Sequence, residues 1–226
     1  MPGRYTLTTD APALRAAFPW LDIPDELKPR FNVVPTQPVA VVTNEGSHNL
    51  DFVTWGLVPS WASEVKMTNL LINARSEGLS KKPSFKGLYR HKRCIVLADG
   101  VFEWLPEMQG RKKVKTPYYY YLTDHRPFAF AGLWDNWQSI DGSEIKSCCI
   151  ITTEPNEVVA KLHHRMGVIL KQPDIHTWLS PQEMGPEKLD HLLAPYQPAE
   201  EIAYHQVSTL VSNAGNDSPD CIAPLE

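Results

Sequence analysis

Short apolar runs, each closed by proline, glycine or a polar turn, limit most strongly what this chain can fold into. Many of them are rich in β-branched or aromatic residues, which is typical of strands. They follow one another in hairpin-like pairs, without long regular helices between them. The predicted extended segments are residues 30–35, 39–43, 50–58, 94–98, 101–104, 118–122, 128–134, 147–153, 166–170 and 204–210.

Five short helices are predicted among these strands, over residues 11–17, 84–91, 153–162, 174–179 and 186–193. Because strands and helices do not alternate regularly, the pattern argues against a doubly wound parallel sheet. We predict a mixed, mostly antiparallel α+β fold with a curled or barrel-like sheet, as one domain over residues 1–226. Asp99-Gly100 is read as a turn, and residues 111–115 as a basic loop.

The charge of the chain is uneven. The net charge of −4 argues against a protein that binds nucleic acid over its whole surface. Between residues 79 and 98, however, there are six cations and no acid, and a second cationic cluster spans residues 111–115. Such clusters are usually solvated faces, so a local basic groove and a plain surface both stay open.

Several classes of protein lack support in the sequence. The four cysteines have no CxxC spacing, which favours buried thiols over a disulfide framework or a metal site. No HExxH, Walker or GxGxxG motif occurs, so we expect no zinc and no nucleotide cofactor. No signal-peptide pattern and no apolar run of membrane length occur, so we expect a protein without membrane contact, in the cytoplasm or on the nucleoid. We also expect a monomer.

The amino terminus carries a candidate nucleophile. The small residue after Met1 predicts removal of the initiator methionine, which would leave Pro2 with a free secondary amine. An α-amino group has a pKa near 8, against about 10.4 for lysine, so more of it is uncharged and able to attack a carbonyl. Gly3 permits close approach of a ligand, and Arg4 suits a phosphate. The alternative is a frayed terminus without a function.

Two further positions could move protons. Glu103 lies between Phe102 and Trp104, and burial there would raise its pKa and suit it to proton transfer. Simple alternation could instead turn this carboxylate to solvent. Of the adjacent His163 and His164, at most one is expected to face a site, and both could be exposed at a helix end.

Polar and aromatic residues suggest an anionic ligand. Asn73 and Arg75 would share one face of an extended segment, where an amide and a guanidinium suit such a ligand. Loop anchoring by Asn73 is the alternative. Aromatic side chains can stack on bases in single-strand binders, although core packing is favoured for most of these residues. The aromatic candidates are Trp55, Trp61, Phe102 and Trp104.

Eight short segments, in this order along the chain, closely resemble the SOS response-associated peptidase (SRAP) family, which includes abasic-site sensors. The similarity spans nearly the whole sequence. The segments are PGRY (2–5), RFNVVP (30–35), WGLVP (55–59), INARSE (72–77), RCI (93–95), DGVFEW (99–104), LHHRM (162–166) and HQVS (205–208).

The resemblance implies a protein that binds abasic sites in single-stranded DNA and crosslinks to them. In the family, residue 2 is a cysteine whose amine forms a Schiff base with the sugar aldehyde, and whose thiol closes a thiazolidine. Carried over to this sequence, Asn73 would position the amine or the sugar. Glu103 would move protons and assist methionine removal, and His163 would protonate the sugar ring oxygen.

The resemblance also implies DNA contacts and exposes three departures. Arg4 and Arg75, with Arg165 as a further candidate, would hold flanking phosphates, and Trp61 would lie against a base. Pro2 stands where the family has cysteine, while Gly167 and Gln206 stand where it usually has proline.

Without the thiol of residue 2 no thiazolidine can form, so an iminium ion, a transient link and strand scission are expected. Two alternatives remain: an abasic-DNA binder without a covalent step, and a self-processing peptidase that uses Glu103 and His163.

Overall fold

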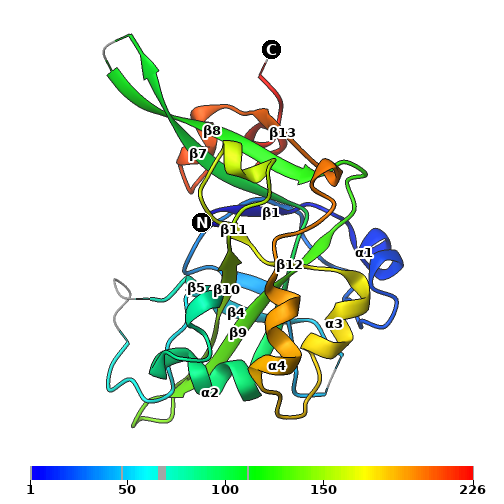
Figure 1. Cartoon of the computed structure of the whole chain (residues 1–226), viewed down its shortest axis with the longest axis vertical. Helices are drawn as coiled ribbons and strands as arrows, with labels where there is room; N and C mark the ends of the chain where they lie inside the picture. The colour runs from blue at the N-terminus through cyan, green and yellow to red at the C-terminus, as the bar shows by residue number, and fades with distance from the viewer. Residues whose placement is uncertain (1, 47, 66–69, 111, 226) are drawn as a thin grey trace.

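Two β-sheets, one of them closed into a barrel, form the centre of the molecule (Figure 1). The computed structural model of the protein describes residues 2–46, 48–65, 70–110 and 112–225. The predicted α+β class with a barrel-like sheet is confirmed.

Five strands of the larger sheet close into a ring. They follow the order β10-β4-β3-β6-β9, and the pairing of β9 with β10 completes the circle. The β4–β10 pair is parallel, while the other pairs of the ring are antiparallel. The ring strands are β3 (Pro38–Thr43), β4 (Asp51–Trp55), β6 (Arg93–Ala98), β9 (Phe128–Gln138) and β10 (Glu144–Thr153).

Three short strands extend the ring at its edges. β5 (Asn73–Arg75) runs parallel to β10, and β11 (Met166–Gly167) pairs with the end of the same strand. β12 (Ile169–Leu170) pairs with β9. These edge strands carry several of the candidate site residues.

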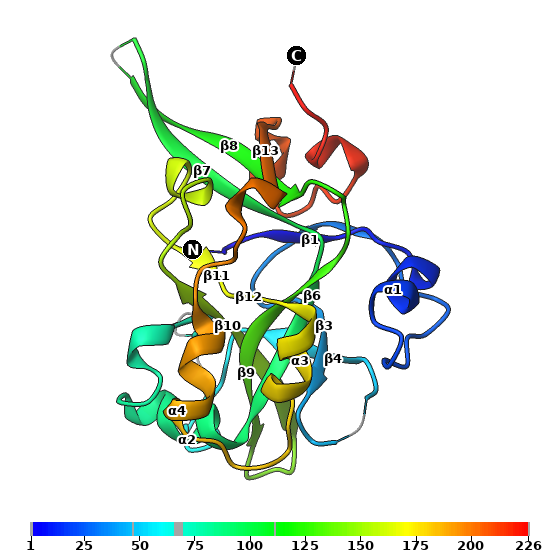
Figure 2. The same cartoon turned by 45° about the vertical axis from the view of Figure 1, so that its right-hand side comes forward.

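The second sheet has the order β13-β8-β7-β1-β2 and is antiparallel throughout. Both views show β1 running between the β7–β8 hairpin of this sheet and the barrel (Figures 1 and 2). The strands of the second sheet are β1 (Tyr5–Leu7), β2 (Arg30–Val33), β7 (Gly100–Gln109), β8 (Lys112–Leu122) and β13 (Ile202–Gln206).

The chain passes from the barrel to the second sheet at Asp99, between β6 and β7. The predicted turn at Asp99-Gly100 is therefore wrong, because the two strands belong to different sheets and do not pair. The Asp99 carboxylate accepts hydrogen bonds from the hydroxyl groups of Thr6, Thr8 and Thr9 and from the backbone N–H groups of Thr8 and Thr9. These hydrogen bonds attach the connection between β6 and β7 to the end of β1 and the residues that follow it.

Four short α-helices pack around the barrel (Figure 2). Asp10 caps the first one, since its carboxylate accepts a hydrogen bond from the Ala13 N–H at 2.9 Å. The other three each have proline in the first turn, where a missing N–H has no consequence. The helices are α1 (Ala11–Ala17), α2 (Pro83–His91), α3 (Gln172–Trp178) and α4 (Pro186–Leu189).

The remaining helical turns in the described residues are of the 3₁₀ type. One of them stands where the sequence predicted a longer α-helix. Instead of a helix over 153–162, only η3 forms, because the Asn156 side chain caps the Val159 N–H and also binds Tyr196 O. The 3₁₀ turns are η2 (Ser76–Gly78), η3 (Val159–Lys161), η4 (Asp190–Leu193), η5 (Ala199–Glu201), η6 (Thr209–Ser212) and η7 (Pro219–Cys221).

The prediction for the basic segment 111–115 also needs correction. Residues 112–115 belong to β8 and pair with β7 as a hairpin, while Arg111 lies outside the described residues. The hairpin predicted from 39–43 and 50–58 is confirmed as β3–β4. The four cysteines are buried free thiols, as predicted.

Candidate active site

The second residue of the chain lies buried beside the first residue of β5. The side-chain amide of Asn73 donates a hydrogen bond of 2.9 Å from Nδ2 to Pro2 O. Asn73 is held in place because β5 pairs with β10, where Asn73 lies opposite Ile150. The other amide atom, Asn73 Oδ1, is buried and has no hydrogen-bond partner among the described residues.

Gly167 of β11 makes room for Pro2. A Cβ at position 167 would lie 3.1 Å from Pro2 Cγ and closer still to Phe130 Cε1. Both contacts are shorter than an ordinary van der Waals distance, so any larger residue would displace the proline ring or the phenyl ring. Residues 2 and 167, two positions where this chain departs from the family it resembles, therefore contact each other.

Glu103 is buried in β7, with an exposed fraction of 5%. Burial raises the pKa of its carboxyl to about 7, and the positive charge of the amino terminus opposes this rise. The alternative that alternation turns Glu103 to solvent is therefore wrong. A carboxyl with a pKa near 7 can both give and take a proton at neutral pH.

Tyr120 faces the same side of the sheet as Glu103. Val101 lies opposite Tyr120 and Glu103 opposite Tyr118 in the β7–β8 ladder, so the carboxyl and the Tyr120 ring are diagonal neighbours. The Tyr120 hydroxyl is buried without a hydrogen-bond partner in the described parts of the chain. Burial, and then the charge of Glu103, raise the pKa of this phenol.

His163 is held in one orientation by the loop that follows it. The Arg165 N–H can donate to Nδ1 at 3.0 Å when the proton of the neutral ring is on Nε2, while a proton on Nδ1 would be donated to Arg165 O. Arg165 O lies 3.1 Å from the same nitrogen. Burial, followed by the positive charge of the amino terminus, lowers the pKa of His163 to about 4. The ring is therefore neutral at pH 7, and it stacks on the exposed His164.

The amino-terminal charge acts on both Glu103 and His163, which joins the three groups into one electrostatic cluster. The side chains around the amino terminus come from β7, from β5 and from the loop before β11, which lie in different parts of the sequence. A carboxyl and a neutral imidazole beside the amide of Asn73 suit proton transfer during an attack on a carbonyl.

Two of the predicted DNA contacts are accessible. Arg75 is exposed at the end of β5, and the extended backbone places it on the same face as Asn73, as predicted. Trp61 has an exposed fraction of 71%. Trp55 and Phe102, by contrast, are core residues. Stacking on a base is therefore open to Trp61 and closed to the two buried rings.

Arg165 is buried, and its guanidinium is already paired. It donates from Nη1 and Nη2 to the two carboxylate oxygens of Glu77, at 2.5 and 3.0 Å, and from Nη2 to Thr152 O at 2.6 Å. These bonds hold the loop of His163 against β10. A phosphate contact by Arg165 stays a prediction.

Arg4 is turned away from Glu103. The Phe102 N–H donates to Arg4 O, so the two residues are paired and share the face of the sheet opposite to Glu103. The guanidinium donates to Asn32 Oδ1 and to the carbonyl oxygens of Val211 and Ser212. It also lies 5.5 Å from the centre of the Trp104 ring. Its phosphate contact also stays a prediction.

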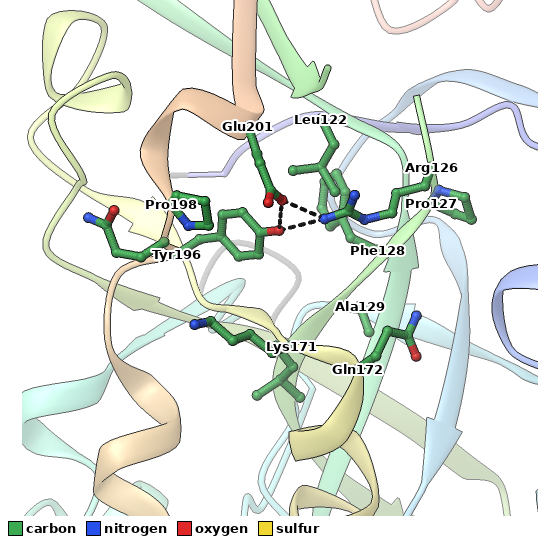
Figure 3. Close-up of a pocket in the computed structure, with 12 residues that line it drawn as sticks. Leu122, Arg126, Pro127, Phe128, Ala129, Lys171, Gln172, Tyr196, Pro198 and Glu201 are labelled. Atoms are coloured by element: carbon green, nitrogen blue, oxygen red, sulfur yellow. Dashed lines mark hydrogen bonds and ion pairs between the residues drawn. The ribbon is translucent and has the colours of Figure 1, made fainter. Parts of the chain in front are cut away.

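A separate cavity of about 360 Å³ opens between the end of β8 and the start of α3 (Figure 3). Arg126 donates to Tyr196 Oη and Glu201 Oε2 at 2.7 and 2.6 Å, and Tyr196 donates to the same carboxylate oxygen. None of the candidate site residues lines this cavity. Its arginine is paired with a carboxylate.

Metal and membrane sites find no support in the described parts of the chain. No group of three or more His, Cys, Asp or Glu side chains could hold a metal ion there. Within the same residues, no helix is both long enough and apolar enough to cross a membrane.

The fold and the cluster define a class of protein: an α+β scaffold with a closed barrel that holds the chain's amino terminus beside an amide, a carboxyl and an imidazole. The family model described as SOS response associated peptidase (SRAP) matches residues 1–214. The chain belongs to this family.

Relatives of known name and structure agree with this assignment. The "Abasic site processing protein YoqW" of Bacillus subtilis (strain 168) is 40% identical over 98% of this chain and 99% of its own. The "Abasic site processing protein HMCES" of Gallus gallus is 37% identical over 76% of this chain and 56% of its own. A protein of Bacteroides thetaiotaomicron has a crystal structure with a TM-score of 0.84 and 26% identity, covering 99% of this chain and 100% of its own.

Sequence reasoning misses two features of the site. Alternation within the tyrosine run places Tyr120 on one face with Tyr118, but it gives no reason to expect a buried hydroxyl beside Glu103. Gly167 stands out in the sequence only as a departure from the family, since its contact with Pro2 joins segments 165 residues apart and has no local signal.

Proposed function

We propose that this protein processes abasic sites in single-stranded DNA through the amine of Pro2, freed by removal of Met1. The Asn73–Pro2 hydrogen bond carries the proposal, since it holds the second residue beside Asn73, and the charge of the preceding amino terminus acts on both Glu103 and His163. Membership of the family and the printed names of the relatives support the same substrate.

The first step would be attack of the Pro2 nitrogen on the C1′ aldehyde of the open abasic sugar. The nitrogen loses its proton, and the new carbinolamine loses its hydroxyl as water, which leaves an iminium ion. Both steps need a group that exchanges protons near pH 7. Glu103, with a pKa of about 7, suits this role.

His163 would act as a hydrogen-bond donor in the preceding step. The closed sugar must open before its aldehyde is available, and a donor to the ring oxygen favours opening. With the Arg165 N–H as the donor to Nδ1, the neutral His163 ring would present Nε2–H for this purpose. At a pKa of about 4, the ring works by hydrogen bonding more than as a charged acid.

The fate of the iminium ion would differ from that of a thiol-containing site. Pro2 has no thiol to close a ring, so water can hydrolyse the ion and release the intact sugar. Alternatively, loss of a C2′ proton and departure of the 3′ phosphate break the strand. A transient link with strand scission is therefore the expected outcome.

A monomer acting on single-stranded DNA fits the surface of the site. Arg75 and Trp61 are exposed and able to bind a phosphate and stack on an unpaired base. Their replacement should weaken DNA binding without altering the cluster itself.

Borohydride trapping tests the proposal. Protein shown by intact mass to lack Met1 is incubated with abasic single-stranded DNA, with and without borohydride, and adduct and strand cleavage are followed together. A trapped adduct with Pro2 is expected, and its absence would exclude imine chemistry. Binding without trapping would identify a non-covalent binder. If Glu103→Gln keeps Met1 while the unsubstituted protein loses it, the chain processes itself.

A further inference from the structure

The outer half of the β7–β8 hairpin is an arm without neighbours in its sheet. The two strands pair from Gly100–Tyr121 to Gln109–Lys112. β1 covers only residues 100–101 of β7, and β13 covers only residues 118–122 of β8. Residues 106–110 and 112–115 therefore extend beyond both flanking strands, and the arm projects from the rest of the molecule in both views (Figures 1 and 2).

The two faces of the arm differ in charge. On the face of Glu103, the carboxylate of Glu107 accepts hydrogen bonds from the hydroxyl groups of Thr116 and Tyr118. The ladder register places Lys113 and Lys115 on the opposite face. Both lysines are exposed there, and no acid of the arm shares that face.

The same face carries apolar surface and leads back to the amino terminus. Met108, opposite Lys113, has an exposed fraction of 66%, and Pro106, opposite Lys115, is exposed as well. Trp104 follows at the base of the arm, with the Arg4 guanidinium over its ring. Arg4 is two residues from Pro2 along the chain, so the cations of this face begin near the amino terminus, on the side of the sheet opposite to Glu103.

The spacing of the lysines suits a nucleic-acid strand. Two residues of a strand span about 7 Å, and a DNA strand in a duplex carries one phosphate for about every 3.4 Å. Lysines bind phosphates as flexible point charges, and apolar side chains beside them can support unstacked bases. The net charge of −4 makes this concentration of cations a local feature.

We propose that this face of the arm is a second DNA contact, where Lys113 and Lys115 bind phosphates of the single strand that flanks the abasic nucleotide. The proposal rests on the proposed function for the identity of the strand, but not on any covalent step. Since phosphate contacts do not depend on the lesion, the arm binds undamaged single strands as well.

The double variant Lys113→Ala/Lys115→Ala tests the arm in full-length protein. Binding to abasic and undamaged single strands is measured over a range of salt concentrations. The plot of log K against log salt should become shallower by about 0.7 for each lysine, and binding at about 0.1 M salt should weaken about tenfold. Shortening the flank on one side of the lesion, and only on that side, should abolish the difference between variant and unsubstituted protein.

Two matched variants separate this contact from general effects. Lys171→Ala/Lys188→Ala removes the same charge at α3 and α4, away from the arm in Figure 1, and should leave the salt dependence unchanged. Lys113→Arg/Lys115→Arg keeps the charge and should retain binding.

Equal affinities and slopes for the alanine variant and the unsubstituted protein would overturn the proposal, as would a lack of any DNA binding. Binding that depends on the arm, without trapping, would leave this contact standing and contradict the imine chemistry alone.

Discussion

The side-chain amide of Asn73 donates a hydrogen bond of 2.9 Å to the carbonyl oxygen of Pro2 and so ties β5 to the second residue of the chain. Asn73→Asp keeps the size of the side chain but replaces the donor with a carboxylate oxygen, which repels the carbonyl. A reacting nitrogen displaced by about 1 Å can cost a factor of about 100 in rate. We expect borohydride trapping to slow by at least about tenfold.

Asn44→Ala provides the control for this variant. Asn44 donates to His91 O and Ser180 O, and it lies outside the candidate site. Its loss should lower stability by on the order of 1 kcal/mol or more while the trapping rate per folded molecule stays unchanged. Equal trapping rates for Asn73→Asp and the unsubstituted protein would contradict a positioning role for Asn73.

The carboxyl of Glu103 should make stability depend on pH in an unusual direction. Its pKa rises from 4.5 to about 7 on folding, so the folded state binds the extra proton between these values. The free energy of unfolding should therefore fall as pH rises from about 4.5 to 7, by up to about 3 kcal/mol, and then level off. Urea titrations of the unsubstituted protein and of Glu103→Gln measure this, and the difference between them should change with pH. A difference that is constant with pH would show that the carboxyl has an ordinary pKa.

The imidazole of His163 should remain neutral down to about pH 5, with its proton on Nε2. Burial lowers its pKa to about 4, and in the proposed tautomer the Arg165 N–H donates to Nδ1. Nitrogen NMR shifts of labelled protein report both the tautomer and the titration, and His163→Gln assigns the signals. His164, which is exposed, provides the comparison within one spectrum. A proton on Nδ1 at pH 7 would contradict the proposed donor to the sugar oxygen.

Local signals explain which elements the sequence predicted. The β3–β4 hairpin and α1 depend on neighbouring residues, namely alternation with a short turn in one case and the Asp10 cap in the other. The helix expected over 153–162 failed because Asn156 makes bonds to Tyr196, forty residues further along. The basic segment 112–115 became a strand because its backbone pairs with residues 106–109 of β7.

The rest of the fold and the site could not be predicted from local patterns, because they depend on contacts between distant segments of the chain. A barrel-like sheet was predicted, but its closure depends on the parallel pairing of Ser147 with Thr54, for which no local pattern exists. Glu103 was a candidate from its aromatic neighbours, and its burial answered the question that alternation left open. Its convergence with Asn73 and His163 came only from the family resemblance, because local patterns do not report which distant segments meet.

The hydroxyl of Tyr120 should reduce stability in the free protein. It is buried without a partner in the described residues, which costs about 1 to 3 kcal/mol. Tyr120→Phe keeps the ring and should raise the free energy of unfolding by about 1 kcal/mol. Tyr89→Phe is the matched control, because the Tyr89 hydroxyl donates to Asp190 Oδ1 at 2.6 Å, and its loss should lower stability. A fall in stability for both variants would mean that the Tyr120 hydroxyl has a favourable partner in solution.

Pro2→Cys should convert a transient link into a durable one. Once Met1 is removed, the amine of the introduced cysteine can form the imine with the sugar aldehyde. The thiol sulfur then adds to C1′ while its proton passes to the nitrogen, which closes a five-membered ring without any redox change. Asn73 can still bind the backbone carbonyl of residue 2, and Gly167 leaves room for the smaller side chain. The adduct should survive heating without borohydride, as measured by denaturing electrophoresis. Pro2→Ala retains an amine but no thiol, so its adduct should appear only after borohydride. A heat-labile adduct for Pro2→Cys would show that the thiol cannot reach C1′ in this site.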